Sequence, residues 1–279
     1  MSVASHEDGT RAISEDEGRD VAVSKQGAST RGGMRIEADS LGKREVPVDA
    51  YYGIQTLRGQ ENFRITGLSV HPALIRGLVM VKKATALAHA ELGQIPNHIG
   101  QAIARAADDA LAGKFDSGFI LDPIQGGAGT SINMNVNEVL ANRAIEILGG
   151  VKGDYSVVSP LNHVNMGQST NDAVPTGARV GLLTQLKGTL GGLDRLADAL
   201  EAKSDEFKDV VKMGRTHLQD AVPITAGQEF GAWAKVIRRD MKRIEAASED
   251  LHIINLGGTA VGTGLNVDIR FIHLVCEKL

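Results

Sequence analysis

The stretch LTQLKGTLGGLDRLADALEAKSDEFKDVV, residues 183–211, decides the fold. Its apolar and small residues recur at alternating steps of three and four: Leu183, Leu186, Leu190, Leu193, Ala197, Leu200, Ser204, Phe207 and Val211. This spacing places them on one face of a helix and predicts that the helix packs lengthwise against another helix.

A second seam lies downstream. Phe230, Ile237, Ile244 and Leu251 follow at steps of seven, with Ala234, Met241 and Ser248 between them. At about 1.5 Å per residue, each helix would be about 40–50 Å long. Helices of that length do not fit within a compact globule, so we expect an elongated bundle shared between subunits. Glycines occupy positions 177, 181, 188, 191 and 192 of the first helix, which predicts that another helix passes close to them.

The sequence upstream of the seams predicts shorter elements. Prolines at 72 and 175 suit the first turn of a helix, and helices are expected over residues 72–92, over 97–113 and from near 132 to 149. A short strand is expected at Arg35–Glu37. Residues 1–33 are rich in charge and poor in large apolar side chains, so we expect them to be disordered. The predicted fold is mainly α, with an N-terminal mixed helical domain (34–171) and a partial long-helix bundle (172–279).

Composition excludes several classes of protein. Lys+Arg 30 against Asp+Glu 34 gives a net charge of -4, which argues against nucleic-acid binding. The single cysteine excludes a disulfide framework and a multi-cysteine metal site. No apolar run is long enough to predict a membrane span, and the N-terminus resembles neither a secretory signal nor a mitochondrial transit peptide. We therefore expect a cytoplasmic protein whose core consists of Ala, Leu, Val and Ile.

Three polar segments stand between the apolar helices: Gly129-Thr130-Ser131, Gln168-Ser169-Thr170-Asn171-Asp172 and Met213–Asp220. The first two precede predicted helices, where free N–H groups and the helix dipole favour an anion. Together the three are suited to hold a carboxylate without a metal. The alternative for each alone is an ordinary N-cap, and a lone His217 is more often structural than catalytic. Asn133, Asn135 and Asn137 are unusual within a helix and are expected to bond backbone or line a polar site.

Residues 34–279 resemble the aspartase/fumarase superfamily. The matching stretches are MRIE (34–37), LGKREVP (41–47), DAYYG (49–53), GGAGTSINMNVNEVLANR (126–143), QSTND (168–172), GRTHLQDAVP (214–223) and GGTAVGTGLN (257–266). Fumarases usually carry SGTQ where this chain has Gly129-Thr130-Ser131, and QSSND where it has QSTND. The resemblance is therefore to the aspartase branch of the superfamily.

The resemblance implies elimination of ammonia from L-aspartate to give fumarate, through an enediolate on the β-carboxylate and without a cofactor or metal. Thr130, Ser169 and Thr170 would surround that carboxylate. Asn171, Thr216 and His217 would hold the amino group and the α-carboxylate. The resemblance also implies a homotetramer in which the three polar segments of one site come from different subunits.

The residues alone and the family resemblance point to different general bases. The residues alone point to His217, because histidine is the commonest base near neutral pH. The resemblance implies instead a serine in a loop of the type GSSxMPxKxNP, which does not occur in this sequence. We therefore expect a C-terminally truncated chain that is inactive alone, with His217 orienting the substrate. Two alternatives stay open: a fumarate hydratase, and a non-catalytic helical scaffold that acts through assembly.

Overall fold

The computed structural model describes residues 30, 31 and 33–279. The predicted disordered segment, residues 1–33, therefore lies outside the described residues except near its end. There, β1 (Thr30–Arg31) pairs antiparallel with β2 (Met34–Asp39), which contains the predicted strand. β2 pairs in turn with β3 (Gly42–Pro47), so the three strands form a small sheet in the order β1-β2-β3.

The rest of the described chain is mainly helical, as the sequence predicts. The helices are α1 (Ile54–Asn62), α2 (Pro72–Glu91), α3 (Asn97–Leu111), α4 (Thr130–Ile147), α5 (Thr170–Glu206), α6 (Ala226–Ser248) and α7 (Ile269–Lys278). Short turns η1 (Asp116–Gly118), η2 (Pro160–Val164) and η3 (Glu249–His252) connect some of them. Between α5 and α6, β4 (Val211–Thr216) and β5 (Gln219–Thr225) form a separate hairpin.

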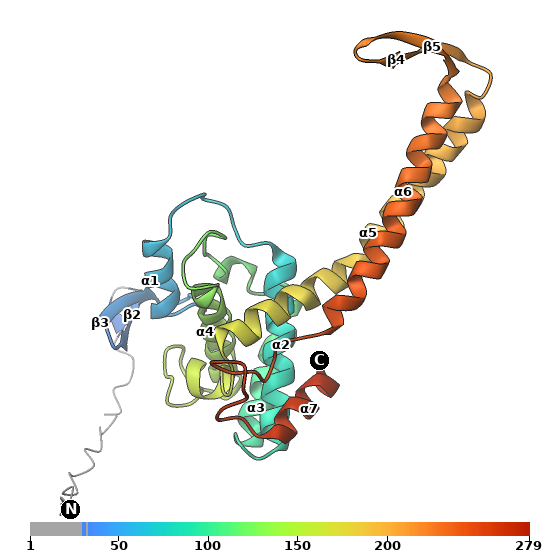
Figure 1. Cartoon of the computed structure of the whole chain (residues 1–279). Coiled ribbons are helices and arrows are strands. Elements are labelled where there is room, and N and C mark those ends of the chain that lie inside the picture. The colour runs from blue at the N-terminus through green and yellow to red at the C-terminus, as the bar shows by residue number, and fades with distance from the viewer. Residues whose placement is uncertain (1–29, 32) are drawn as a thin grey trace, which may run out of the picture.

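Figure 1 shows two regions of different shape. The base consists of β1–β3, α1–α4, the whole of α7 and the first turns of α5. The stalk consists of the rest of α5, the β4–β5 hairpin at its tip and α6, which returns along α5. The seams predicted from the sequence face each other along the stalk, where Ala197 of α5 and Ala234 of α6 are both fully buried.

The core lies in the base, where α2 packs against α3, α5 and α7 and α3 packs against α4. Its buried residues are chiefly small and aliphatic, as composition predicts: Leu78, Val79, Val81, Ala84, Ala86, Ala88, Ile103, Ala106, Ala107, Val136, Val139, Leu140, Ala141, Ala144 and Ile145. Small side chains let helix axes approach closely, so the core fills without many aromatic rings.

Glycine makes the crossing of α2 and α5 possible. A Cβ on Gly77 would overlap the carbonyl oxygen of Gly177, and a Cβ on Gly181 would overlap that of Ala73. The predicted close approach is therefore confirmed for Gly177 and Gly181. Within this chain no other helix approaches glycines 188, 191 and 192: a Cβ at 188 meets nothing within 4 Å, and the other two meet only Arg195 of their own helix. For these three the close helix would have to come from another subunit, which stays a prediction.

Two boundaries of α5 differ from prediction. The helix begins at Thr170 rather than near Pro175, because Ser169 and Asp172 form a capping box that satisfies the free N–H groups earlier. Pro175 lies inside the helix. The helix ends at Glu206, so Val211 of the predicted seam belongs to β4 instead. With 37 residues, α5 is about 55 Å long, whereas the 23 residues of α6 span about 35 Å.

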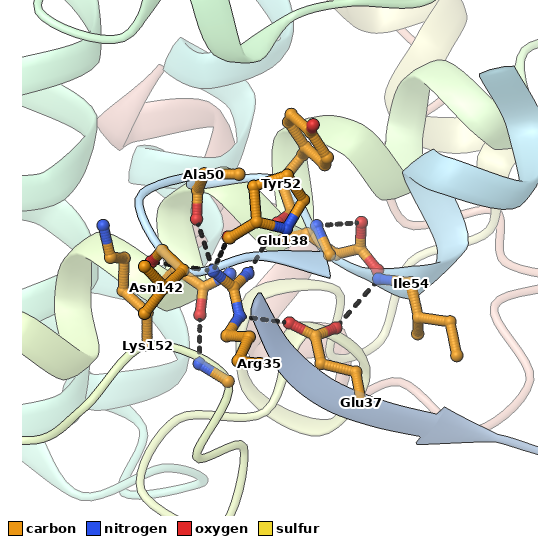
Figure 2. A network of polar contacts seen from close by, with 12 residues as sticks. Arg35, Glu37, Ala50, Tyr52, Ile54, Glu138, Asn142 and Lys152 are labelled. Carbon is orange, nitrogen blue, oxygen red and sulfur yellow. Dashed lines mark hydrogen bonds and ion pairs between the residues drawn. The ribbon is translucent and has the colours of Figure 1, made fainter. Parts of the chain in front are cut away.

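A buried polar network fixes the sheet to the helices of the base (Figure 2). Arg35 donates to Glu37 at 2.8 Å and to the carbonyls of Ala50 and Tyr52 at 2.7 Å. Glu37 also accepts from the N–H of Ile54 at the start of α1, and Glu138 of α4 accepts from the neighbouring N–H groups. Burial and the charge of Glu37 raise the pKa of Glu138 to about 7. The stretches MRIE and DAYYG thus serve the architecture of the base.

Candidate functional site

The glycine-rich loop before α4 is shaped by three consecutive residues with positive φ. Gly127, Ala128 and Gly129 have φ of 75°, 53° and 89°, which reverses the chain immediately before Thr130. Because Gly129 has no side chain to cap the helix, Gln125 accepts from the N–H of Ile132 instead, at 2.9 Å. The start of α4 is therefore held by residues outside the helix. α4 begins at Thr130, two residues earlier than the sequence indicates.

The N-terminus of α5 lies beside that of α4. Ser169 caps α5 by accepting from the N–H of Asn171 at 3.2 Å, and its own N–H donates to Asp172 at 3.0 Å. The hydroxyl of Thr130 lies 3.4 Å from the hydroxyl of Thr170. The structure thus brings the first two predicted segments together within one chain, whereas the resemblance implies that all three segments of a site come from different subunits. Two helix N-termini with several hydroxyls form an arrangement that favours a negatively charged ligand.

These residues are accessible from outside. Thr130 and Asn171 are exposed, and Ser169 and Thr170 are partly exposed. Asp172, one residue further along α5, is buried. A ligand at this position would therefore contact hydroxyl groups and N–H groups rather than the Asp172 carboxylate. Exposed hydroxyl and amide groups above a buried Asp172 form a surface that is suited to binding a small anion.

A buried polar cluster lies beneath the N-terminus of α5. Lys82 of α2 donates to the side-chain oxygens of Asn165 and Gln168, both at 2.8 Å. Asn133 and Asn137 of α4 donate to the same oxygen of Asn165, at 3.0 and 3.2 Å. Asn133 and Asn137 thus line a polar site, as predicted, while Asn135 bonds backbone through the carbonyl of Gly118.

Lys82 could have been found from the sequence. It lies four residues after Leu78 and three before Thr85, on the buried face of a helix whose other charged residues, Arg76, Lys83 and Glu91, are not buried. A lysine there is fully buried in the structure. Burial lowers its pKa well below the usual value, while the charge of Asp172 acts in the opposite direction. A charged side chain at a core position of a predicted helix is the sequence signal that marks Lys82 as a candidate functional residue.

The GGTAVGTGLN stretch folds onto the same place. The N–H of Thr259 donates to the carboxylate of Asp172 at 2.9 Å. The loop closes on itself where the N–H of Gly264 donates to the carbonyl of Gly258, also at 2.9 Å. Asp172 therefore joins this loop to the capping box of α5. The loop is more than the helix terminator that its composition also allows.

The third polar segment lies elsewhere. Thr216 is the last residue of β4, and His217 lies in the turn of the β4–β5 hairpin; both are exposed. His217 and Leu218 have φ of 49° and 61°. The hairpin is at the tip of the stalk, separated from Thr170 by the 37 residues of α5 (Figure 1). That length is about 55 Å, so Thr216 and His217 do not meet the other candidate residues within one chain.

Among the described residues, no helix is long and apolar enough to cross a membrane. Over the same part of the chain, His, Cys, Asp and Glu side chains form no group of three or more that could hold a metal ion.

Three known proteins show what the chain is similar to. It is 55% identical over 246 residues to an aspartate ammonia-lyase of Bacillus sp, covering 88% of this chain and 53% of that protein. The crystal structure of a fumarate lyase:delta crystallin from Brucella melitensis bound to cobalt matches with a TM-score of 0.83 at 49% identity, covering 88% of this chain and 54% of that one. A class II fumarase from Schistosoma mansoni matches with a TM-score of 0.80 at 37% identity, covering 88% and 52%.

These similarities cover nearly all of the described chain and both of its regions. The chain spans about half the length of the curated relatives it matches. A family model described as lyase matches residues 42–279, which include the paired N-termini of α4 and α5, the hairpin turn and the loop on Asp172. The chain therefore belongs to this lyase family.

Proposed function

We propose that the protein is an aspartate ammonia-lyase that acts in the cytoplasm and converts L-aspartate to fumarate and ammonia. One observation carries the proposal: the chain is 55% identical to the Bacillus sp aspartate ammonia-lyase across 88% of its own length, against 37% to the Schistosoma mansoni fumarase. The local sequence differences at Ser131 and Thr170 favour the same choice.

The chemistry explains why the N-termini of α4 and α5 belong to the site. Loss of a proton from Cβ of aspartate moves charge onto the β-carboxylate, which becomes a doubly negative enediolate before ammonia leaves. Fixed donors around that carboxylate lower the barrier because they need no reorganisation when the charge develops. We assign this role to Thr130, Ser169 and Thr170, which lie at two adjoining helix N-termini. The Thr130 hydroxyl donates to the carbonyl of Gly127 at 2.6 Å, so it must rotate to donate to the substrate.

The remaining assignments need a second subunit. Asn171 is on the same helix turn, whereas Thr216 and His217 are at the stalk tip. We propose that these two residues orient the amino group and α-carboxylate of a substrate bound at the base of another copy. The stalk supports such an assembly, because Leu182, Leu196 and Trp233 expose 57%, 46% and 51% of their surface. We expect a homotetramer, as the family resemblance implies.

The test uses the product of the complete reading frame that contains residues 1–279, whatever its length. Ammonia release and fumarate formation are measured with L-aspartate, and fumarate formation is measured with malate. Release of ammonia from L-aspartate supports the proposal. Activity on malate alone would establish a fumarate hydratase, and inactivity on both in a folded protein would favour a non-catalytic scaffold.

Residues 1–279 expressed alone provide a second test. We expect no detectable ammonia release, because the family's base is a serine in a GSSxMPxKxNP loop and no such loop occurs in these residues. Robust turnover by this polypeptide would assign the base to a group within it, with His217 the first candidate. The His217→Ala variant of the same polypeptide would then decide whether that histidine is the base.

A further inference from the structure

The buried polar cluster beneath α5 is not used by the assignments above. Lys82 is fully buried, yet its ammonium group has no carboxylate within ion-pairing distance among the described residues. Its hydrogen-bond acceptors are two neutral amide oxygens, of Asn165 and Gln168. A buried charge with only neutral partners costs stability, and an apolar residue in its place is often neutral or stabilising. Packing alone therefore does not explain a lysine at this position.

The contacts of Lys82 lead directly to the candidate anion site. Asn165 donates to the carbonyl of Gln168 at 3.1 Å, which shapes the turn that delivers the chain to Ser169. Gln168 donates to the hydroxyl of Thr85 on α2 and to the carbonyl of Val164. The turn 165–168 is thus held between α2 and its own backbone, with Lys82 bonded to both ends. Movement of Lys82 would move the cap of α5.

We propose that Lys82 is a positioning residue for the substrate carboxylate: it fixes the turn 165–168 and, in its protonated form, supplies positive charge beneath the N-terminus of α5. This inference rests on the proposed function, because it takes the ligand to be a dicarboxylate. Lys82 acts through Asn165 and Gln168 and through its field. It adds to the dipole of α5, so both favour a negative group at Ser169 and Thr170.

The charged and titratable groups around Lys82 determine the direction of the pH dependence. Asp172 of α5 is the carboxylate whose charge acts on it, and His89 lies two turns along α2, bonded to the carbonyl of Met166. The side chains that α4 and the turn present to the cluster are neutral amides. Because burial lowers the pKa of Lys82, the side chain loses its charge as pH rises through that value. A bound dicarboxylate favours the charged form, so its affinity falls over the same pH range.

The experiment compares wild type with Lys82→Met, Lys82→Gln and Lys83→Met in the complete gene product. Lys83 is the matched control: it is the next residue of α2 and forms a surface ion pair with Asp108 at 2.5 Å. The inhibition constant of succinate, an unreactive dicarboxylate, is measured across pH together with kcat and KM for L-aspartate. Melting temperatures establish that each variant is folded.

We expect both Lys82 variants to fold and to raise the succinate inhibition constant by about 10-fold or more below the pKa of Lys82. We also expect them to lose the decline in affinity that wild type shows at higher pH, and Lys83→Met to behave as wild type. Folded Lys82 variants with unchanged affinity and an unchanged pH profile would overturn the inference while the proposed function stands. A uniform loss at every pH would overturn the role of the charge. A folded wild type that neither turns over L-aspartate nor binds succinate would overturn the proposed function itself.

Discussion

The base and the stalk tip carry parts of one candidate site, but they hold those parts in different ways. At the base, Thr130 and Thr170 are fixed by two helix caps, a glycine turn and a buried cluster. At the tip, Thr216 is the exposed last residue of β4, and His217 opens the exposed two-residue turn formed with Leu218. The base therefore has a preorganised surface within one chain, whereas the tip would be positioned by contact with another subunit. Under the proposed function, oxyanion stabilisation would be built into the fold and substrate orientation into the assembly.

The largest expected effect comes from the preorganised side. Ser169→Ala in the complete gene product removes a hydroxyl donor and the cap of α5, and we expect kcat for L-aspartate to fall by about 100–1000-fold. Thr189→Ala is the matched control, since Thr189 lies on the same helix and its hydroxyl bonds only the carbonyl of Gln185. Steady-state kinetics measures both. Near-normal turnover by the Ser169 variant would remove this residue from the carboxylate site.

The second prediction tests whether the two regions act across subunits. Ser169→Ala and His217→Ala inactivate opposite ends of the chain, so each pure variant should have little activity. If a site combines the base of one copy with the tip of another, mixed assemblies contain some sites with both native residues. Activity after co-refolding should recover to about a quarter of wild type, as expected for random assembly of oligomers. Absence of recovery, with mixed oligomers demonstrated by differently tagged subunits, would mean that Ser169 and His217 do not share a site.

Much of the fold is predictable from the sequence, because its periodicity is local. The apolar seams, the prolines that begin helices and the glycines that end them indicate α2, α3 and the paired stalk helices to within a few residues. The start of α5 is not predictable from Pro175 alone, because the Ser169–Asp172 capping box outweighs one backbone hydrogen bond lost at the proline. The β4–β5 hairpin is likewise not predictable, since its polar turn resembles any loop between two helices.

The candidate site is predictable only in part, for a physical reason. Hydroxyl and amide residues before helices mark Thr130, Ser169 and Thr170, and the structure brings Thr130 and Thr170 to 3.4 Å. The position of Lys82 on a buried helix face is visible in the sequence, but its contacts with Asn165 and Gln168, 83 and 86 residues away, are not. Contacts at such separations depend on how α2 crosses α5. In the sequence, the glycines at this crossing cannot be told from glycines 188, 191 and 192, which meet no other helix of the chain.

The third prediction uses those glycines to compare the stability of the two regions. Gly181→Ala should destabilise the protein by about 1–3 kcal/mol, because the methyl group would overlap the carbonyl of Ala73. Gly188→Ala, seven residues along the same helix, meets nothing within 4 Å in one chain. Wherever no partner subunit covers this position, the substitution should stabilise by about 0.5–1 kcal/mol through helix propensity. Urea unfolding of both variants measures the difference. Destabilisation by Gly188→Ala would show that the stalk is covered there in solution.

The smallest effect on stability is expected at the tip, where a substitution should steady the hairpin locally but weaken activity. Leu218 has a positive φ of 61° and exposes 92% of its surface, so a lone chain gains nothing from it. Leu218→Asn suits the left-handed conformation and should slow hydrogen exchange in β4 and β5, with little change in overall stability. If the tip inserts into another copy, the same substitution removes an apolar contact, and KM for L-aspartate should rise. Slower exchange with unchanged KM would mean that Leu218 contacts nothing in the active assembly, and that the tip is positioned by the strands of the hairpin alone.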